Sequence, residues 1–197
     1  LPVILIQSRK GSTRFPGKVD QIIHGDTMKH VVSQRARQAD IGHVIIARAE
    51  DWPGIPENDV LGRFMTVLYG RDYDPIIRCT ADTPLLDPGL LRAVYATQWT
   101  GEYELVSMGP AWDGLDFEII SRKALARAHA LATEPRDREH VTPWIRRQGK
   151  WKEIPLEGTT LRWSVDDPSG LDFVRRVFAA CEHCRTAVPR HTNSRTS

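Results

Sequence analysis

The sequence predicts an α/β fold in which helices cover both faces of a mostly parallel sheet. Strand-like and helix-like segments alternate along most of the 197 residues, which is the order that parallel sheets require. The first strand is a continuous apolar run, "VILI", which indicates burial on both faces. Because no internal repeat or linker interrupts this order, we expect a single domain over 1–182 and a disordered polar tail over 183–197.

The predicted strands are short runs of apolar or β-branched residues that end at polar loops. They fall at 2–7, 43–47, 75–80, 103–108, 115–120 and 161–165. The runs at 2–7 and 43–47 contain few polar residues, so we expect both to be buried strands.

The predicted helices carry apolar residues at helical spacing. They fall at 27–39, 58–70, 87–99, 122–131, 139–149 and 168–181. Asn58 or Asp59 is expected to cap the second helix, and Ser121 the fourth. Gly70 stands where the second helix should end, and Pro88 lies in the first turn of the third, where proline is tolerated.

The composition excludes several classes of protein. The net charge of +2 is too small to indicate nucleic acid or a membrane surface as the main partner. No apolar run approaches the ~18 residues of a membrane span, and the apolar part of the first ten residues is too short for a secretory signal. We therefore expect a cytoplasmic protein. The three cysteines do not suggest a disulfide framework, and Cys181-x-x-Cys184 has no second pair to complete a zinc site.

A basic loop, "SRKGSTRFPGKV" at 8–19, follows the first predicted strand directly. It contains no acidic residue, and its basic residues are Arg9, Lys10, Arg14 and Lys18. Gly11 and Gly17 would let the backbone approach an anion closely, so the loop is typical of phosphate binding. Five residues separate these glycines and Val19 follows the lysine, so the loop is not a Walker A motif. A solvated surface loop is the alternative.

Two aspartates follow two of the predicted strands. Asp82 comes just after the strand at 75–80, and Asp166 just after the strand at 161–165. If both strands run parallel to the first, the two carboxylates lie at the same edge of the sheet as the basic loop. Two carboxylates that face a phosphate-binding loop are suited to Mg²⁺ bound to triphosphate oxygens. The alternative for each aspartate is a turn or a helix cap.

Six segments occur in the order found in one known family. They are "IQSRKGSTRFPGKV", "NDVLGRF", "IIRCTADTPLLDP", "GLDFEIISRKAL", "DREHVTPWI" and "LRWSVDDPSGLDFV". The chain thereby resembles the cytidylyltransferases of the spore-coat polysaccharide protein F type and, more distantly, the CMP-sialic acid and CMP-Kdo synthetases. The resemblance implies the three-layer, Rossmann-like fold of nucleotide-diphospho-sugar transferases with a mostly parallel sheet.

The same resemblance implies a function in polysaccharide biosynthesis. CMP would pass from CTP to a sugar or sugar-acid acceptor with release of pyrophosphate, with Mg²⁺ as cofactor and a homodimer as the assembly. The loop residues that would hold the triphosphate are Arg9, Gly11, Ser12, Arg14 and Lys18. Asp82 and Asp166 would bind the metal, with Asp166 favoured over Asp167. Together with Arg14 and Lys18, these two aspartates form the expected catalytic set.

Two further segments match the walls of the family's acceptor site. The residues concerned are Asp116, Glu118, Arg138, Glu139 and His140, of which Arg138 would pair with an acceptor carboxylate. Simpler interpretations stay open, because Asp116 and Glu118 could form a solvated strand face. "DREH" could be only the start of a helix, and His140 only a core or surface histidine.

The chain departs from the family between the second strand and "NDVLGRF". Ten residues, 48–57, span the gap that a strand–helix unit usually fills, so either the unit is deleted or the chain crosses the sheet edge directly. Two rival functions remain: a glycosyltransferase of GT-A type, and a nucleotide-binding homologue without turnover. The first needs an Asp-x-Asp pair after a strand, which "TADTP" provides poorly because Thr83 and Pro84 follow Asp82.

Overall fold

The computed structural model describes residues 1–109, 112–155 and 162–181, and the tail predicted at 183–197 lies outside these ranges. A six-stranded sheet has the order β4-β1-β5-β7-β6-β8, and β7 alone is antiparallel to its neighbours. Its strands are β1 (Val3–Ser8), β4 (His43–Arg48), β5 (Ile76–Thr80), β6 (Leu105–Met108), β7 (Glu118–Ile120) and β8 (Trp151–Ile154). The predicted α/β class with a mostly parallel sheet is confirmed.

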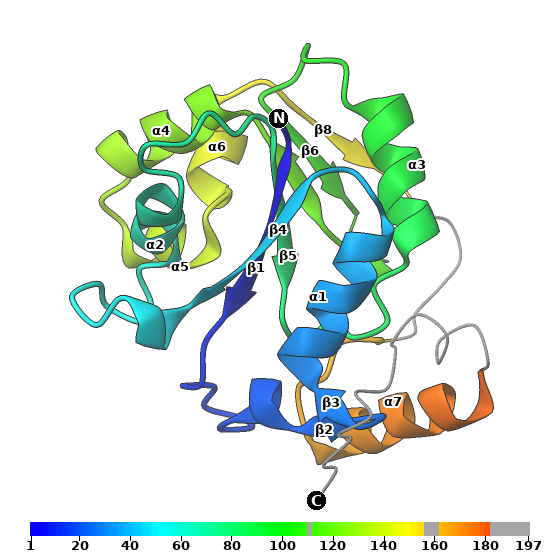
Figure 1. Cartoon of the computed structure of the whole chain (residues 1–197). Helices are drawn as coiled ribbons and strands as arrows, with labels where there is room; N and C mark the ends of the chain where they lie inside the picture. The colour runs from blue at the N-terminus through cyan, green and yellow to red at the C-terminus, as the bar shows by residue number, and fades with distance from the viewer. Residues whose placement is uncertain (110–111, 156–161, 182–197) are drawn as a thin grey trace, which may run out of the picture.

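Helices cover both faces of this sheet (Figure 1). One face carries α1 (Met28–Gln38) and α3 (Pro88–Gln98). The other carries α2 (Val60–Val67), α4 (Arg122–Leu131), α5 (Pro135–His140) and α6 (Pro143–Gln148). Alternate residues of β1 supply the two cores: Leu5 packs with the second group of helices, and Ile4 and Ile6 pack with the first. The buried apolar run predicted at 2–7 is therefore a strand with a core on each side.

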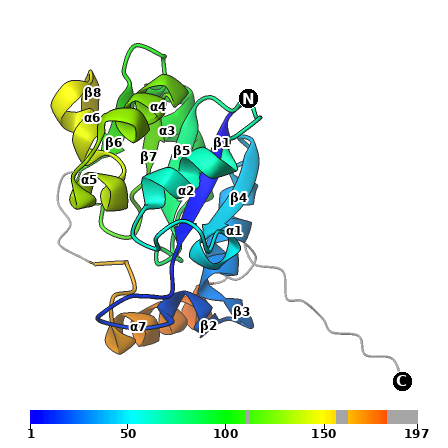
Figure 2. The ribbon, with the colours of Figure 1, turned by 90° about the vertical axis from the view of Figure 1, so that its left-hand side faces the viewer.

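A third apolar cluster lies below the carboxyl ends of the parallel strands (Figure 2). It joins α7 (Pro168–Ala180) to α1 and to the small hairpin of β2 (Ile22–Ile23) and β3 (Asp26–Thr27). The loop after β1 runs between the sheet and this layer and ends in the short 3-10 helix η1 (Lys18–Asp20). The third layer thus places the basic loop beside the segment that leads into α7.

Three of the helix ends follow the predicted capping chemistry. The carboxylate of Asp59, rather than Asn58, accepts a hydrogen bond from Gly62 N at the start of α2. Ser121 caps α4 in the same way through Ala124 N. Gly70, two residues beyond the C-cap of α2, has a φ of 69°, a conformation that glycine adopts at little cost.

The prediction of a strand at 161–165 is wrong over the residues that the structure describes. Residues 162–165 are irregular, residue 161 lies outside the described ranges, and the last strand of the sheet is β8. The segment forms isolated backbone bonds, from Trp163 N to Asp113 O and from Val165 N to Asp82 O, instead of a ladder. These bonds join it to the loop after β5 and to the segment before β7, not to a strand of the sheet.

Two further predictions need adjustment. The helix predicted at 139–149 is two helices, α5 and α6, separated at Val141, which has a φ of 70°. Pro143 lacks the N–H that a continuous helix would need, so it starts a new helix instead. β4 lies at the edge of the sheet and only Ala47 of it is buried, because the connector 48–57 provides the 3-10 turn η2 (Ala49–Asp51) and no further strand.

A search of the described helices found none with the length and apolar character needed to span a bilayer.

Candidate active site

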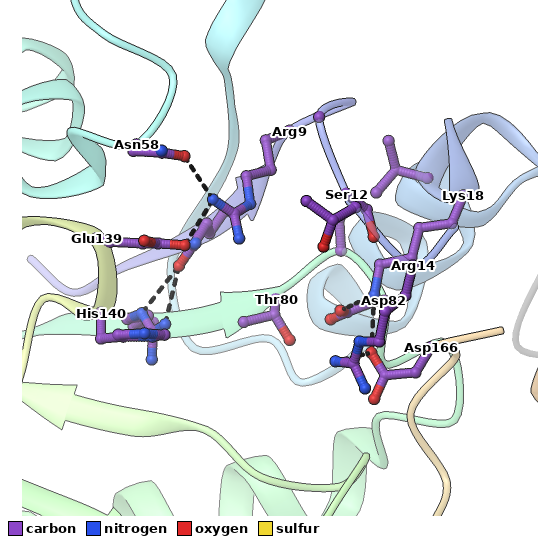
Figure 3. Close-up of a pocket in the computed structure, with 16 residues that line it drawn as sticks. Arg9, Ser12, Arg14, Lys18, Asn58, Thr80, Asp82, Glu139, His140 and Asp166 are labelled. Atoms are coloured by element: carbon purple, nitrogen blue, oxygen red, sulfur yellow. Dashed lines mark hydrogen bonds and ion pairs between the residues drawn. The ribbon is translucent and has the colours of Figure 1, made fainter. Parts of the chain in front are cut away.

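The basic loop forms one wall of a cavity at the carboxyl ends of β1 and β5. The cavity has a volume of about 460 Å³. Its lining residues are Gln7, Arg9, Gly11, Ser12, Thr13, Arg14, Lys18, Val19, Asn58, Arg78, Thr80, Ala81, Asp82, Glu139, His140 and Asp166. The predicted triphosphate-binding residues and both predicted metal ligands are in this set. The lining residues, from Gln7 to Asp166, thus converge on one recess, although they come from five separate segments of the chain (Figure 3).

The ammonium group of Lys18 lies between the two aspartates. Its Nζ donates to Asp82 Oδ2 at 2.7 Å, to Asp166 Oδ1 at 3.1 Å and to the carbonyl oxygen of Val165 at 2.9 Å. Lys18 is 8% exposed, because η1 turns its side chain inward beneath the loop. Three oxygen acceptors therefore match the three donors of a buried ammonium, and one positive charge holds two negative ones together.

Two further cationic side chains pair with the carboxylate of Asp166, one at each oxygen. Arg14 donates to its Oδ1 at 3.0 Å, and Arg162 pairs with its Oδ2 and with Asp113 at 2.9 Å. Asp167 instead caps α7 through Gly170 N at 2.9 Å, and the Ser169 hydroxyl hydrogen bond contributes most to lowering its pKa. Asp166 therefore faces the cavity and Asp167 does not line it. Arg14, Lys18, Asp82 and Asp166 are called the loop cluster below.

Acidic partners compensate the remaining charge of the basic loop. Arg9 pairs with Glu139 at 2.7 Å and donates to Asn58 at 2.7 Å. Gly11 N donates to the carboxylate of Glu57 at 2.8 Å, and a Cβ at Gly11 would stand 2.5 Å from that carboxylate. The loop thus already binds an anion, a side-chain carboxylate, through a backbone N–H at a position where only glycine fits without a shift.

The predicted acceptor residues divide into two groups. Glu139 and His140 line the cavity, and Figure 3 shows them with Arg9 at the end away from the loop cluster. Arg138 does not line it: its guanidinium donates to Asp59 at 2.8 Å and to the carbonyl oxygen of Ala132 at 3.2 Å. These bonds tie α5 to the start of α2 and the end of α4.

Glu118 and Asp116 also lie outside the cavity lining. Glu118 is 8% exposed and accepts bonds from Arg78, Arg146 and Thr142. These four residues and Ser107, which pairs with Arg146, are called the sheet cluster below. Asp116 is an exposed residue, yet desolvation by the surrounding protein raises its pKa even though Gly114 N donates to it at 3.0 Å.

Sequence reasoning missed several residues of the cavity, and Arg78 is the most notable. It is a charged residue in the middle of the otherwise apolar strand β5, and this position was the available signal. Gln7, the polar residue near the end of β1, accepts two hydrogen bonds from Arg78, at 2.9 and 3.2 Å. No sequence pattern identified Asn58 and Thr80 as residues of the cavity.

The donor set of the loop cluster fits a hard divalent cation. Within the described ranges, no group of three or more His, Cys, Asp or Glu side chains could hold a metal ion. Asp82 and Asp166 are two carboxylates joined by one cationic group, and Mg²⁺ is commonly bound by one or two carboxylates with substrate phosphates completing its shell. The buried thiol of Cys79, by contrast, has its pKa raised by burial to about 12, so it offers no thiolate nucleophile.

The architecture defines the class of protein first. The structure superposes on a cytidylyltransferase from Leptospira borgpetersenii with a TM-score of 0.80 at 22% identity, over 92% of this chain and 88% of the other. A CMP:2-keto-3-deoxy-manno-octonic acid synthetase complexed with CTP gives 0.63 at 17% identity, over 91% and 98%. A manganese complex of Rv0371C from Mycobacterium tuberculosis gives 0.58 at 13% identity, over 89% and 99%. The fold is that of the nucleotide-diphospho-sugar transferases.

Sequence relatives then identify the family. A 3-deoxy-manno-octulosonate cytidylyltransferase from Mesorhizobium japonicum is 30% identical in an alignment that covers 90% of this chain and 98% of the relative. Spore coat polysaccharide biosynthesis protein SpsF from Bacillus subtilis is 28% identical over 73% of this chain and 69% of that protein. Some other relatives align over less than half their length, such as 46% for one from Paramagnetospirillum magneticum. Residues 3–51 match the family model described as cytidylyltransferase. The chain belongs to the cytidylyltransferase family.

Proposed function

We propose that this protein transfers CMP from CTP to a sugar or sugar-acid acceptor, with release of pyrophosphate and with Mg²⁺ as cofactor. One observation carries the proposal: Lys18 joins Asp82 and Asp166 at 2.7 and 3.1 Å beside a glycine-containing basic loop. The named activities of the family's relatives, and the CTP and manganese complexes of structural neighbours, support the nucleotide and the need for a divalent cation.

The loop would bind the triphosphate by exchanging its present partners. Gly11 N and Arg14 now bind carboxylates, those of Glu57 and Asp166. Phosphate oxygens present the same chemistry with more charge, so they can replace these carboxylates as the acceptors. Arg14 is largely exposed, which leaves its guanidinium free to turn toward a nucleotide in the cavity.

Catalysis would then be positioning and charge neutralisation rather than covalent chemistry. The acceptor oxygen attacks the α-phosphorus in line, and pyrophosphate leaves. Lys18 and Arg14 would stabilise the charge that develops on the leaving group. Asp82 and Asp166 would hold Mg²⁺, which, when bound, supplies the positive charge that stabilises the phosphoryl oxygens.

A pyrophosphate-release assay tests the proposal. Each of the four NTPs is offered with Mg²⁺ and a panel of sugar acids and sugar phosphates. We expect release with CTP and an acceptor together, loss of release with EDTA, and recovery when excess Mg²⁺ is added.

Three results would contradict the proposal. Transfer of sugar from a nucleotide sugar without pyrophosphate release would indicate a glycosyltransferase. Tight CTP binding without release across the panel would indicate a homologue without turnover. Unchanged release in EDTA would remove the metal from the mechanism.

A further inference from the structure

A row of polar residues crosses the apolar sheet beside the cavity. In the register of the sheet, Arg78 of β5 lies opposite Glu118 of β7, which lies opposite Ser107 of β6. The residues two positions before Arg78 and two after Glu118, Ile76 and Ile120, belong to the apolar core beneath α2, α4 and α6. The row therefore interrupts a buried hydrophobic face, where charged groups are costly unless they are paired or serve a function.

The contacts of this row fix the orientation of Arg78. Its NH1 donates to Glu118 Oε2 at 2.7 Å, and its Nε and NH2 both donate to Gln7 Oε1. Gln7 and Glu118 come from the two strands that flank β5, so they hold the guanidinium from both sides. A planar group that is held from both sides has a fixed orientation, so it loses less conformational entropy when it binds a further group.

Arg78 is the member of the sheet cluster that reaches the cavity. Gln7 and Arg78 line it, whereas Glu118 and Arg146 do not. Glu118 is shared by both guanidinium groups, at 2.7 Å from Arg78 and 2.9 Å from Arg146, so it neutralises only part of their charge. Asp116 is the other nearby carboxyl, and its hydrogen bond comes from Gly114 N instead. Arg78 thus presents positive charge to the cavity.

The other cations of the cavity are engaged differently. Lys18 and Arg14 bind the aspartates of the loop cluster, which is the end proposed for the triphosphate and metal. Arg9 has its own carboxylate partner in Glu139. Arg138, the residue that the sequence favoured for an acceptor carboxylate, does not line the cavity. Arg78 is the lining arginine whose carboxylate partner is buried behind it and shared.

We propose that Arg78 binds an anionic group, a carboxylate or a phosphate, on the acceptor, with Gln7 and Glu118 as its positioning residues. The inference rests on the proposed function, because it places the acceptor in the same cavity as the nucleotide. It restricts the acceptor to acidic compounds and makes Arg78 the residue that rejects their uncharged analogues, since a charge-assisted hydrogen bond is lost with them.

Binding to the nucleotide-loaded protein tests Arg78 without turnover. Wild type, Arg78→Gln and Arg146→Gln are saturated with a CTP analogue that has a methylene bridge between its α and β phosphorus atoms. Calorimetry then measures the affinity for three probes: 3-deoxy-manno-octulosonate as the carboxylate, sorbitol 6-phosphate as the phosphate and sorbitol as the uncharged control. Arg146→Gln is the matched control, because it removes the other guanidinium of Glu118 without changing the cavity lining.

We expect wild type to bind at least one of the anions and to bind sorbitol far more weakly. Arg78→Gln should weaken anion binding by about 10- to 100-fold, the usual effect of one charged hydrogen-bonded contact. Arg146→Gln should weaken anion binding clearly less than Arg78→Gln does, because the guanidinium of Arg78 still lines the cavity, and all three proteins should bind the CTP analogue alike.

Three outcomes would overturn the assignment of Arg78. They are anion binding unchanged in Arg78→Gln, equal losses in the two variants, and a wild type that binds the analogue but neither anion. Failure of the proposed function is recognised separately, because then the wild type either does not bind the CTP analogue or binds both ligands and releases no pyrophosphate from CTP.

Discussion

The loop cluster and the sheet cluster use the same ion-pair chemistry in opposite ways. In the loop cluster, the partners come from irregular segments, and Arg14 and Lys18 are separated from Asp166 by about 150 positions in the sequence. In the sheet cluster, Arg78 and Glu118 are opposite each other on neighbouring strands. The first set of partners can separate without breaking a backbone ladder, whereas the second cannot.

Exposure separates Arg14 from the other members, because the side chains of Lys18 and Asp166 in the loop cluster are only 10% and 15% exposed. The Arg14 side chain is 66% exposed, whereas those of Arg78 and Glu118 are 14% and 10% exposed. An exposed pair is weak and exchanges its partner readily, while a buried pair is strongly destabilised when one partner is removed. The comparison teaches that Arg14 is suited to exchange its partner for a substrate, whereas the sheet cluster is suited to hold a fixed donor. Variants in each cluster should therefore fail in different assays.

The largest effect is expected from Asp82→Ala in the loop cluster. Turnover should fall by about 10³-fold or more, because the reaction would lose a metal ligand and the charge stabilisation that depends on it. The measurement is kcat for pyrophosphate release, with urea unfolding to show that the variant is folded.

Asp87→Ala is the matched control for Asp82→Ala. Asp87 follows the same strand but caps α3 through Leu90 N at 2.7 Å and does not line the cavity. The Asp87→Ala substitution should lower the free energy of unfolding by about 1 kcal/mol and leave turnover nearly unchanged. Full activity in Asp82→Ala would remove the metal hypothesis.

Asp82 and Asp166 bind the same ammonium group, and their positions show which parts of the site the sequence could predict. The position of Asp82 followed from the strand before it, and β5 is present as predicted. Asp166 lies beside it although the strand predicted at 161–165 does not form over its described residues; a single backbone bond, from Val165 N to Asp82 O, joins the two segments. Alternation of apolar residues predicts a strand but does not reveal whether a neighbouring edge is available to pair with it.

Other features depended on contacts that no local pattern encodes. The basic loop was recognisable from its charge and glycines, yet its carboxylate partner Glu57 lies 46 positions away. Arg78 could be recognised as unusual inside a strand, but its partner Glu118 depends on the antiparallel insertion of β7 between β5 and β6. Local signals therefore predicted most elements and the cationic side of the site, and missed the pairings that the sheet order creates.

The next effect is a loss of stability from Glu118→Gln in the sheet cluster. The substitution leaves Arg78 and Arg146 near each other without their shared carboxylate. We expect the free energy of unfolding in urea to fall by about 3 kcal/mol, as for other buried ion pairs that lose one partner.

Glu139→Gln provides the comparison, because Glu139 pairs with the partly exposed Arg9 at the same distance of 2.7 Å. Its unfolding free energy should change by no more than about 1 kcal/mol. Equal losses in the two variants would mean that burial does not distinguish the Arg78–Glu118 pair from the Arg9–Glu139 pair.

The smallest effect concerns the pH dependence of Asp116, next to the sheet cluster. Desolvation raises its folded-state pKa above the unfolded value of about 3.9, so the folded protein binds this proton more tightly than the unfolded chain does. Stability from this group is therefore fully present below pH ~4 and is lost as the pH rises through the folded-state pKa. Asp116→Asn should remove that loss, so its stability relative to wild type should increase between pH 3.5 and 7. Urea unfolding across this range measures the difference, and a constant difference would show that the Asp116 carboxyl is not desolvated by its neighbours.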